Sequence, residues 1–193
     1  ADAWMGLGEA MVLLPIWEFR LEKAPQQLER ARLAANKALA LNPTSGRAHA
    51  VLGYMHMLKL EWRECFENYE LALKYNPENA YIWHWYAFAL MGVGNYAMAE
   101  NAYQKALKLD PVSRVINANA AEQFTLSGRY DIALERIDKT LTFAPDFAFA
   151  WHTKGVAHIA KHEFDEARAA FQRDMELTGY QSLKLEVLDF IQE

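Results

Sequence analysis

The sequence has little cysteine, glycine or proline. Its 193 residues include one cysteine, 9 glycines and 6 prolines, while 52% are hydrophobic. A single thiol, Cys65, excludes a disulfide within the chain and also a zinc site built from several thiolates. The low content of glycine and proline, together with the high apolar fraction, excludes a linker or a disordered tail and is typical of a folded domain.

Apolar runs of membrane-spanning length are also lacking. No stretch approaches the roughly 18–20 apolar residues that cross a bilayer, and no basic segment followed by an apolar one opens the chain, so we expect neither a membrane span nor a signal peptide in it. The chain begins at Ala1, and we expect a processed protein or a piece of a longer one. We expect a cytoplasmic rather than a periplasmic location, which a single thiol does not decide.

The chain has no excess of basic residues. It carries 20 Lys and Arg residues against 25 Asp and Glu residues, for a net charge of −5. Surfaces that bind nucleic acid gather Lys and Arg against the phosphates. This charge balance therefore argues against direct binding of nucleic acid by this region.

The sequence does contain a fixed period of 34 residues. Prolines recur at this spacing, at Pro43, Pro77, Pro111 and Pro145. The runs that end at these prolines are alike: KALALNP, LALKYNP, KALKLDP and KTLTFAP. Self-similarity at such a period indicates a helical repeat. Because proline cannot continue a helix, each one is expected to end the second helix of a hairpin, with a break such as Gly94-Asn95 between the two helices.

Aligned units contain two columns of small residues. The eighth position of each unit holds Gly8, Gly53, Ala87, Ala121 and Gly155. The twentieth position holds Ala31, Cys65, Ala99, Ala133 and Ala167. Small side chains allow two helices to approach closely where they cross. We therefore expect both columns to be buried at the crossings, with larger residues such as Tyr69 and Phe171 filling the space between them.

The pattern W-x2-L-G-x2-[Y/M], then A-x3-[F/Y]-x2-A, then P resembles the tetratricopeptide repeat. The first unit carries Trp4, Leu7, Gly8 and Met11 on this pattern, and the fourth departs from it at Asn117, where tryptophan is usual. The resemblance implies an all-α fold, a right-handed α-α superhelical solenoid of about five helical hairpins plus a C-terminal capping helix, in a single domain. The expected units are 1–45, 46–79, 80–113, 114–147 and 148–181, followed by the cap helix 182–193.

The first unit is longer than the others by 11 residues, Val12–Glu22. This insertion contains Pro15, Trp17 and Phe19. One interpretation is a longer first helix that is kinked at Pro15 and packs its aromatic residues on the neighbouring hairpin. The other is a flap that carries an exposed aromatic contact.

The resemblance implies a protein-interaction module without catalysis, in which the first helices of the units line a concave groove. Family geometry directs positions 2, 5, 9, 12 and 13 of each first helix into that groove. The groove residues expected here are Arg47, Tyr54, Met57, Tyr81, His84, Phe88, Met91, Glu122, Phe149 and His152.

The middle of this strip is rich in aromatic residues and methionine. Such residues supply adaptable contact area, so we expect a protein or peptide segment of apolar or aromatic character as the partner. We expect exposure in the groove for the central group, Tyr54, Tyr81, His84, Phe88 and Met91. The alternative is that many of these residues pack between neighbouring helices.

One subfamily uses Lys, Asn and Arg at groove positions to clamp the acidic C-terminal tails of chaperones. The corresponding positions here hold Met5, Glu9, Ala50 and Tyr54. The clamp is absent, and an acidic peptide is not the expected groove ligand.

Catalytic and metal-binding patterns do not stand out. Cys65 lies in a small-residue column and is interpreted as a packing cysteine. His158 and His162 have the i, i+4 spacing of metal ligands, but two histidines make an incomplete site. His49 and His56 replace aromatic residues at core-like positions, and we expect them to be packed and hydrogen-bonded. We therefore expect no enzyme, no catalytic residue, no metal and no cofactor.

Longer runs carry a narrower resemblance. HWYAFALMGVGNY and DPVSRVINANAAEQFTLSGRYDIALE are similar to a bacterial group in which a C-terminal array of these repeats follows a winged-helix DNA-binding domain or another signalling domain. The implied role is the regulatory or sensor part of a bacterial signalling or transcription protein. The alternatives are a free-standing scaffold or assembly adaptor, and a self-associating domain that forms a homodimer through exposed aromatic residues such as Phe190.

Overall fold

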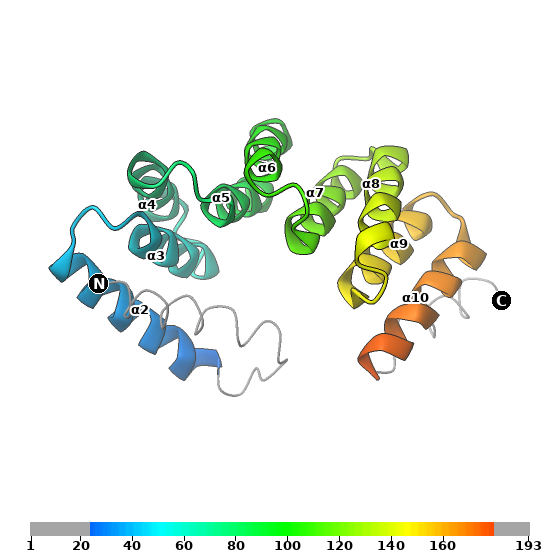
Figure 1. Cartoon of the computed structure of the whole chain (residues 1–193), viewed down its shortest axis with the longest axis horizontal. Helices are drawn as coiled ribbons and strands as arrows, with labels where there is room; N and C mark the ends of the chain where they lie inside the picture. The colour runs from blue at the N-terminus through cyan, green and yellow to red at the C-terminus, as the bar shows by residue number, and fades with distance from the viewer. Residues whose placement is uncertain (1–23, 180–193) are drawn as a thin grey trace. The chain divides into compact units, whose positions relative to one another are not determined.

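The structure, a computed structural model, describes residues 24–179 (Figure 1). In that range the regular structure is entirely helical. The helices are α2 (Ala24–Leu41), α3 (Gly46–Leu58), α4 (Trp62–Tyr75), α5 (Ala80–Gly92), α6 (Tyr96–Leu109), α7 (Arg114–Leu126), α8 (Tyr130–Phe143), α9 (Ala148–Ala160) and α10 (Phe164–Thr178). The predicted all-α helical-repeat fold is confirmed. The insertion Val12–Glu22, the cap helix 182–193, Gly8 and Phe190 lie outside the described residues.

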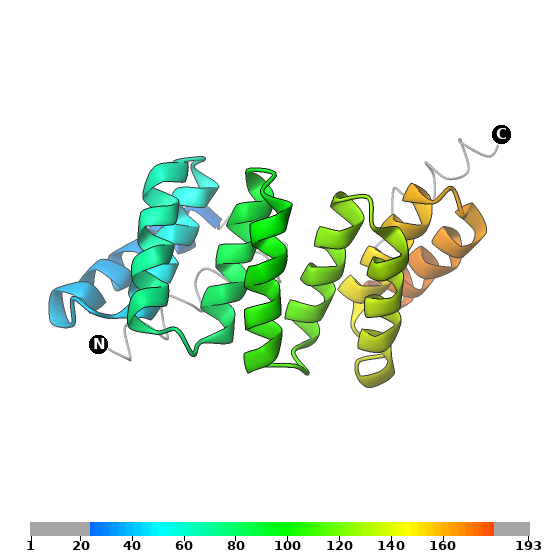
Figure 2. The ribbon, with the colours of Figure 1, turned by 90° about the horizontal axis from the view of Figure 1, so that it is seen from above.

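The chain divides into two compact units, residues 1–95 and residues 96–193. The described part of the first unit holds α2 to α5, and that of the second holds α6 to α10. Within each unit, helices that follow one another in the chain pack together, and α3 and α4 lie side by side in both views (Figures 1 and 2). First helices also contact each other, α3 with α5 and α7 with α9.

The small-residue columns lie at the centre of the packing. Their described alanines and Cys65 have no exposed surface. A Cβ atom added to Gly155 would lie 2.6 Å from the Phe171 ring, and one added to Gly53 would lie 3.2 Å from the Tyr69 ring. Both rings are fully buried. The prediction that small residues allow close crossings filled by large neighbours is therefore confirmed for the described columns.

The loop before each first helix is tied to that helix by a side chain of its first turn. Nε1 of Trp83 donates to the Pro77 carbonyl at 2.7 Å, and Nε1 of Trp151 donates to the Pro145 carbonyl at 2.9 Å. Asn117, the departure from tryptophan, keeps this donor, since its Nδ2 lies 3.1 Å from the Pro111 carbonyl. The period of 34 residues therefore repeats a loop-to-helix hydrogen bond as well as a helix length.

The turn inside each described hairpin also repeats one conformation. The residue after the first helix has a positive φ of 60° at Leu60, 74° at Gly94, 77° at Gly128 and 62° at His162. Glycine adopts this left-handed conformation without strain, whereas leucine and histidine do not. The hairpin geometry is thus imposed at this position even where the local residue disfavours it.

Candidate functional site

Two aromatic residues of the predicted groove are exposed on α5. Tyr81 and Phe88 are seven residues apart, which places them on the same side of the helix two turns apart. Their exposed fractions are 46% and 38%. Exposure is confirmed for these two residues, while their role in binding stays a prediction.

The expected exposure is wrong for Tyr54, His84 and Met91, which are 7%, 7% and 8% exposed. Met57, also on the predicted strip, is similarly buried. The physical reason is that α3 and α5 pack against each other. The Tyr54 ring lies 6.0 Å from the ring of Trp85, and the His84 ring makes an edge contact with Tyr81 at 6.4 Å.

The buried members of this strip carry no charge at neutral pH. Burial lowers the pKa of His84 to about 4 and raises the pKa of Tyr54 to about 12. Arg47, at the start of α3, is partly buried and is the one fully ionised member of the predicted strip among the described residues of the first unit. We call Tyr81 and Phe88, with the buried Tyr54, His84 and Met91, the α3–α5 strip. It is an apolar and neutral surface.

The predicted groove residues of the second unit have a more polar setting. Glu122 on α7 and Phe149 and His152 on α9 are all partly exposed. The Phe149 and His152 rings stack at 6.2 Å with an interplanar angle of 10°. Nδ1 of His152 lies 3.4 Å from Oδ2 of Asp174 on α10. Asp174 stands where repeats of this kind carry a small residue, and that departure was the only sequence signal for this contact.

The remaining singled-out side chains have structural partners. Nδ1 of His49 lies 3.1 Å from Asn68 Oδ1, and Nδ1 of His56 lies 2.7 Å from Glu61 Oε2. The expectation that both histidines are hydrogen-bonded is confirmed, although both stay partly exposed. Burial raises the pKa of the Cys65 thiol to about 11, so it is protonated at neutral pH. Its interpretation as a packing cysteine is confirmed, because only a thiolate is a strong nucleophile.

The pair with metal-ligand spacing serves a hairpin turn. Nδ1 of His158 lies 2.7 Å from Glu163 Oε2, and Glu163 also accepts from Lys161 Nζ at 2.8 Å. His162 instead contacts the Phe164 ring edge-on. Within residues 24–179, no three His, Cys, Asp or Glu side chains gather in a way that could hold a metal ion. In the same range, no helix has both the length and the apolar character needed to cross a membrane.

Comparison with known proteins identifies the repeat. Residues 80–111 match the tetratricopeptide repeat family. A curated relative, the small glutamine-rich tetratricopeptide repeat-containing protein 2 of Mycosarcoma maydis, is 31% identical over 87 residues, which is 45% of this chain. That match spans 25% of the relative's own length.

Solved structures share the fold. PilW, a type IV pilus biogenesis factor, superimposes with a TM-score of 0.76 at 19% identity, over 94% of this chain and 82% of that one. The first TPR of Spaghetti (RPAP3), bound to the HSP90 peptide SRMEEVD, superimposes with a TM-score of 0.54 at 20% identity, over 59% of this chain and 90% of that one. The matched repeat and this fold together make the chain a tetratricopeptide-repeat protein; the likeness to winged-helix regulators finds no counterpart among these matches.

Proposed function

We propose, on the premise that this chain is an array of tetratricopeptide hairpins, that it is a non-catalytic module that binds a segment of a partner protein along the first helices of its repeats. The observation that carries the proposal is the exposed pair Tyr81 and Phe88 on one side of α5. Large aromatic residues that stay exposed on a helix face are typical anchors of protein interfaces. The RPAP3 structure supports the proposal, because a fold of this kind holds a peptide there.

We propose an apolar or aromatic partner segment. The exposed rings of the α3–α5 strip stand over side chains that are neutral at pH 7, so a charged ligand group would lose water there without gaining an opposite charge. The HSP90 peptide SRMEEVD in the RPAP3 structure is acidic. Here the corresponding clamp residue on α3 is replaced by Ala50, which has no exposed surface. The groove chemistry therefore differs from that of an acidic-tail clamp.

A peptide-display selection against the whole chain tests this function. Selected peptides should share apolar or aromatic positions and bind with micromolar affinity, which corresponds to roughly −8 kcal/mol. Replacing Tyr81 and Phe88 by alanine should weaken binding by about 1–2 kcal/mol for each anchor.

The matched control is the double variant Tyr75→Ala and Phe143→Ala. It removes the same two residue types from α4 and α8, where they are 37% and 41% exposed. Its affinity should equal that of the wild type. Equal losses in both double variants, or an acidic consensus among the selected peptides, would contradict the proposal.

We further propose that the module is the regulatory or sensor part of a larger bacterial signalling or transcription protein, binding a peptide, a partner protein or a second copy of itself. The support is the similarity of the runs HWYAFALMGVGNY and DPVSRVINANAAEQFTLSGRYDIALE to that group. The coding sequence upstream of Ala1 is the test. A winged-helix or signalling domain there supports this context, whereas a gene that encodes little else supports a free-standing scaffold or assembly adaptor.

A further inference from the structure

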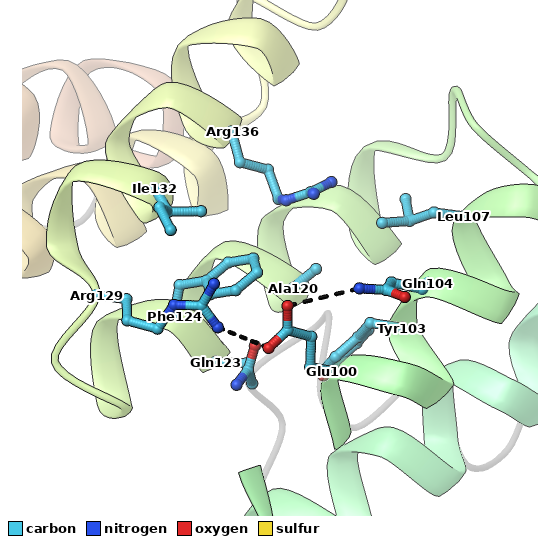
Figure 3. A pocket seen from close by; sticks show the side chains of 10 residues that line it. All are labelled: Glu100, Tyr103, Gln104, Leu107, Ala120, Gln123, Phe124, Arg129, Ile132 and Arg136. Atoms are coloured by element: carbon cyan, nitrogen blue, oxygen red, sulfur yellow. Dashed lines mark hydrogen bonds and ion pairs between the residues drawn. The ribbon is translucent and has the colours of Figure 1, made fainter. Parts of the chain in front are cut away.

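A cavity of about 230 Å³ lies between α6, α7 and α8, entirely within the second unit (Figure 3). We call it the α6–α8 pocket. It is smaller than the roughly 300–1,000 Å³ of small-molecule sites, so it suits one side chain. Of its lining residues on α7, Ala120 and Phe124 each lie two positions from Glu122. Two residues correspond to about 200° around a helix axis, so the pocket is on the side of α7 opposite the predicted groove.

One arginine of the pocket is already neutralised. Nη1 of Arg129 lies 2.6 Å from Oε2 of Glu100, and the guanidinium stands 4.7 Å from the centre of the Phe124 ring. Figure 3 shows this pair on the side of the pocket nearest Phe124. Arg129 and Glu100 therefore form a fixed wall with no net charge.

The second arginine is not neutralised in this way. The guanidinium of Arg136 lies 5.6 Å from the centre of the same Phe124 ring. The acceptor that the described residues offer it is Asn117 Oδ1, at a long 3.5 Å from Nη1. Its Nε–H is buried and has no acceptor among the described residues. A partly buried cation in this setting pays for lost water without the return of a close carboxylate.

The electrostatic surroundings of Arg136 agree with this geometry. Burial lowers its pKa from the ordinary value and outweighs the opposite effect of Glu135 and Glu100. Neither carboxylate lies within ion-pair distance of the guanidinium in the described part of the chain. Leu107 and Ile132 line the space beside it, so the pocket offers apolar walls next to one unmatched positive charge (Figure 3).

We propose that the α6–α8 pocket is a second binding site, which takes one glutamate side chain of a partner protein. The carboxylate would accept hydrogen bonds from the terminal nitrogens of Arg136, a charge-assisted contact that matches the planar guanidinium. The methylenes would contact Leu107 and Ile132. This site is separate from the α3–α5 strip in both place and chemistry, and it does not depend on the function proposed for that strip.

The probes for this site are two capped amino acids, N-acetyl-glutamate amide and N-acetyl-glutamine amide, titrated into the ¹⁵N-labelled whole chain. They have nearly the same shape and differ in charge. The glutamate compound should shift the amide resonances around the pocket saturably, with a dissociation constant in the millimolar range. The glutamine compound should produce no saturable shift. Equal responses to the two compounds, or a flat titration with both, would overturn the proposal without any variant being needed.

Arg136→Gln tests the residue itself. It should weaken binding of the glutamate compound by about tenfold or more, because the charge-assisted contact is lost. Lys139→Gln is the matched control, since it removes one positive charge from an exposed position of the same helix, α8. It should leave the dissociation constant unchanged. An Arg136→Gln protein that folds and binds like the wild type would overturn the assignment.

Discussion

At the residue scale, burial decides which groups of this protein titrate near neutral pH. His84 has an ordinary pKa of 6.5, and burial in the folded chain lowers it to about 4. The unfolded chain therefore binds a proton on His84 at a higher pH than the folded chain does. The stability that neutral His84 supports is complete above pH 6.5 and is lost as the pH falls toward 4.

This difference predicts acid sensitivity that a single substitution reduces. Between pH 7 and pH 4, the free energy of unfolding should fall by up to about 3 kcal/mol through this group alone. The variant His84→Phe keeps a ring at the position but cannot bind a proton, so its stability should fall less over the same range. Urea unfolding of both proteins at several pH values measures the difference. Parallel pH profiles would show that His84 is not protonated differently in the folded and unfolded states.

The glycines of the eighth position make a second residue-scale prediction. Alanine usually stabilises a helix interior relative to glycine, by about 1 kcal/mol. At Gly155 the added Cβ would meet the Phe171 ring at 2.6 Å, so Gly155→Ala should instead destabilise the chain by about 1–3 kcal/mol. Gly53→Ala is the control, because its Cβ would lie 3.2 Å from Tyr69. Chemical denaturation should rank Gly155→Ala clearly below Gly53→Ala, and the reverse order would contradict the crossing geometry.

At the element scale, the hairpin is the repeating object, and its turn imposes a left-handed residue whatever the sequence supplies. Glycine occupies this position at Gly94 and Gly128, whereas Leu60 and His162 adopt the same conformation with a side chain. Leu60 is 69% exposed, so its side chain gains little from burial in return. The turn of the α3–α4 hairpin is therefore strained at a known position.

Relief of that strain should stabilise the protein. Leu60→Gly should raise the free energy of unfolding by about 0.5–1 kcal/mol, which is a shift of roughly 2–4 °C in Tm per kcal/mol for a chain of this size. Gly94→Ala should have the opposite effect, because its φ is 74° and its added Cβ would contact nothing within 4 Å. Calorimetry of both variants is the measurement. A lower Tm for Leu60→Gly would mean that the leucine side chain matters more than its backbone.

Most of the hairpin architecture could be predicted from the sequence, because a 34-residue period, a proline and two columns of small residues are all local signals. Asn117 shows where a pattern of residue types is insufficient. It departs from tryptophan but keeps the hydrogen-bond donor that the Pro111 carbonyl requires. The exposure of Tyr54, His84 and Met91 could not be predicted, since a position on one helix face does not reveal how closely the next helix covers it.

At the scale of the whole chain, the two units share a hairpin plan but differ in surface chemistry. The α3–α5 strip of the first unit is apolar and neutral, while the second unit presents Glu122 and the His152–Asp174 pair. The α6–α8 pocket could not be predicted at all, because its charge balance depends on side chains from three helices that meet only in the folded unit. These differences lead us to place the apolar part of a partner segment on the first unit.

The central claim, that a partner segment binds along the first helices, is tested most directly by site-specific photo-crosslinking with a selected peptide. p-Benzoylphenylalanine is introduced in place of Phe88 on α5 or, as the matched control, in place of Phe143 on α8. Both residues are phenylalanines of similar exposure, 38% and 41%. The account predicts a crosslink from position 88 that unlabelled peptide competes away, and none from position 143. Crosslinking from position 143 alone, or equally from both, would contradict it.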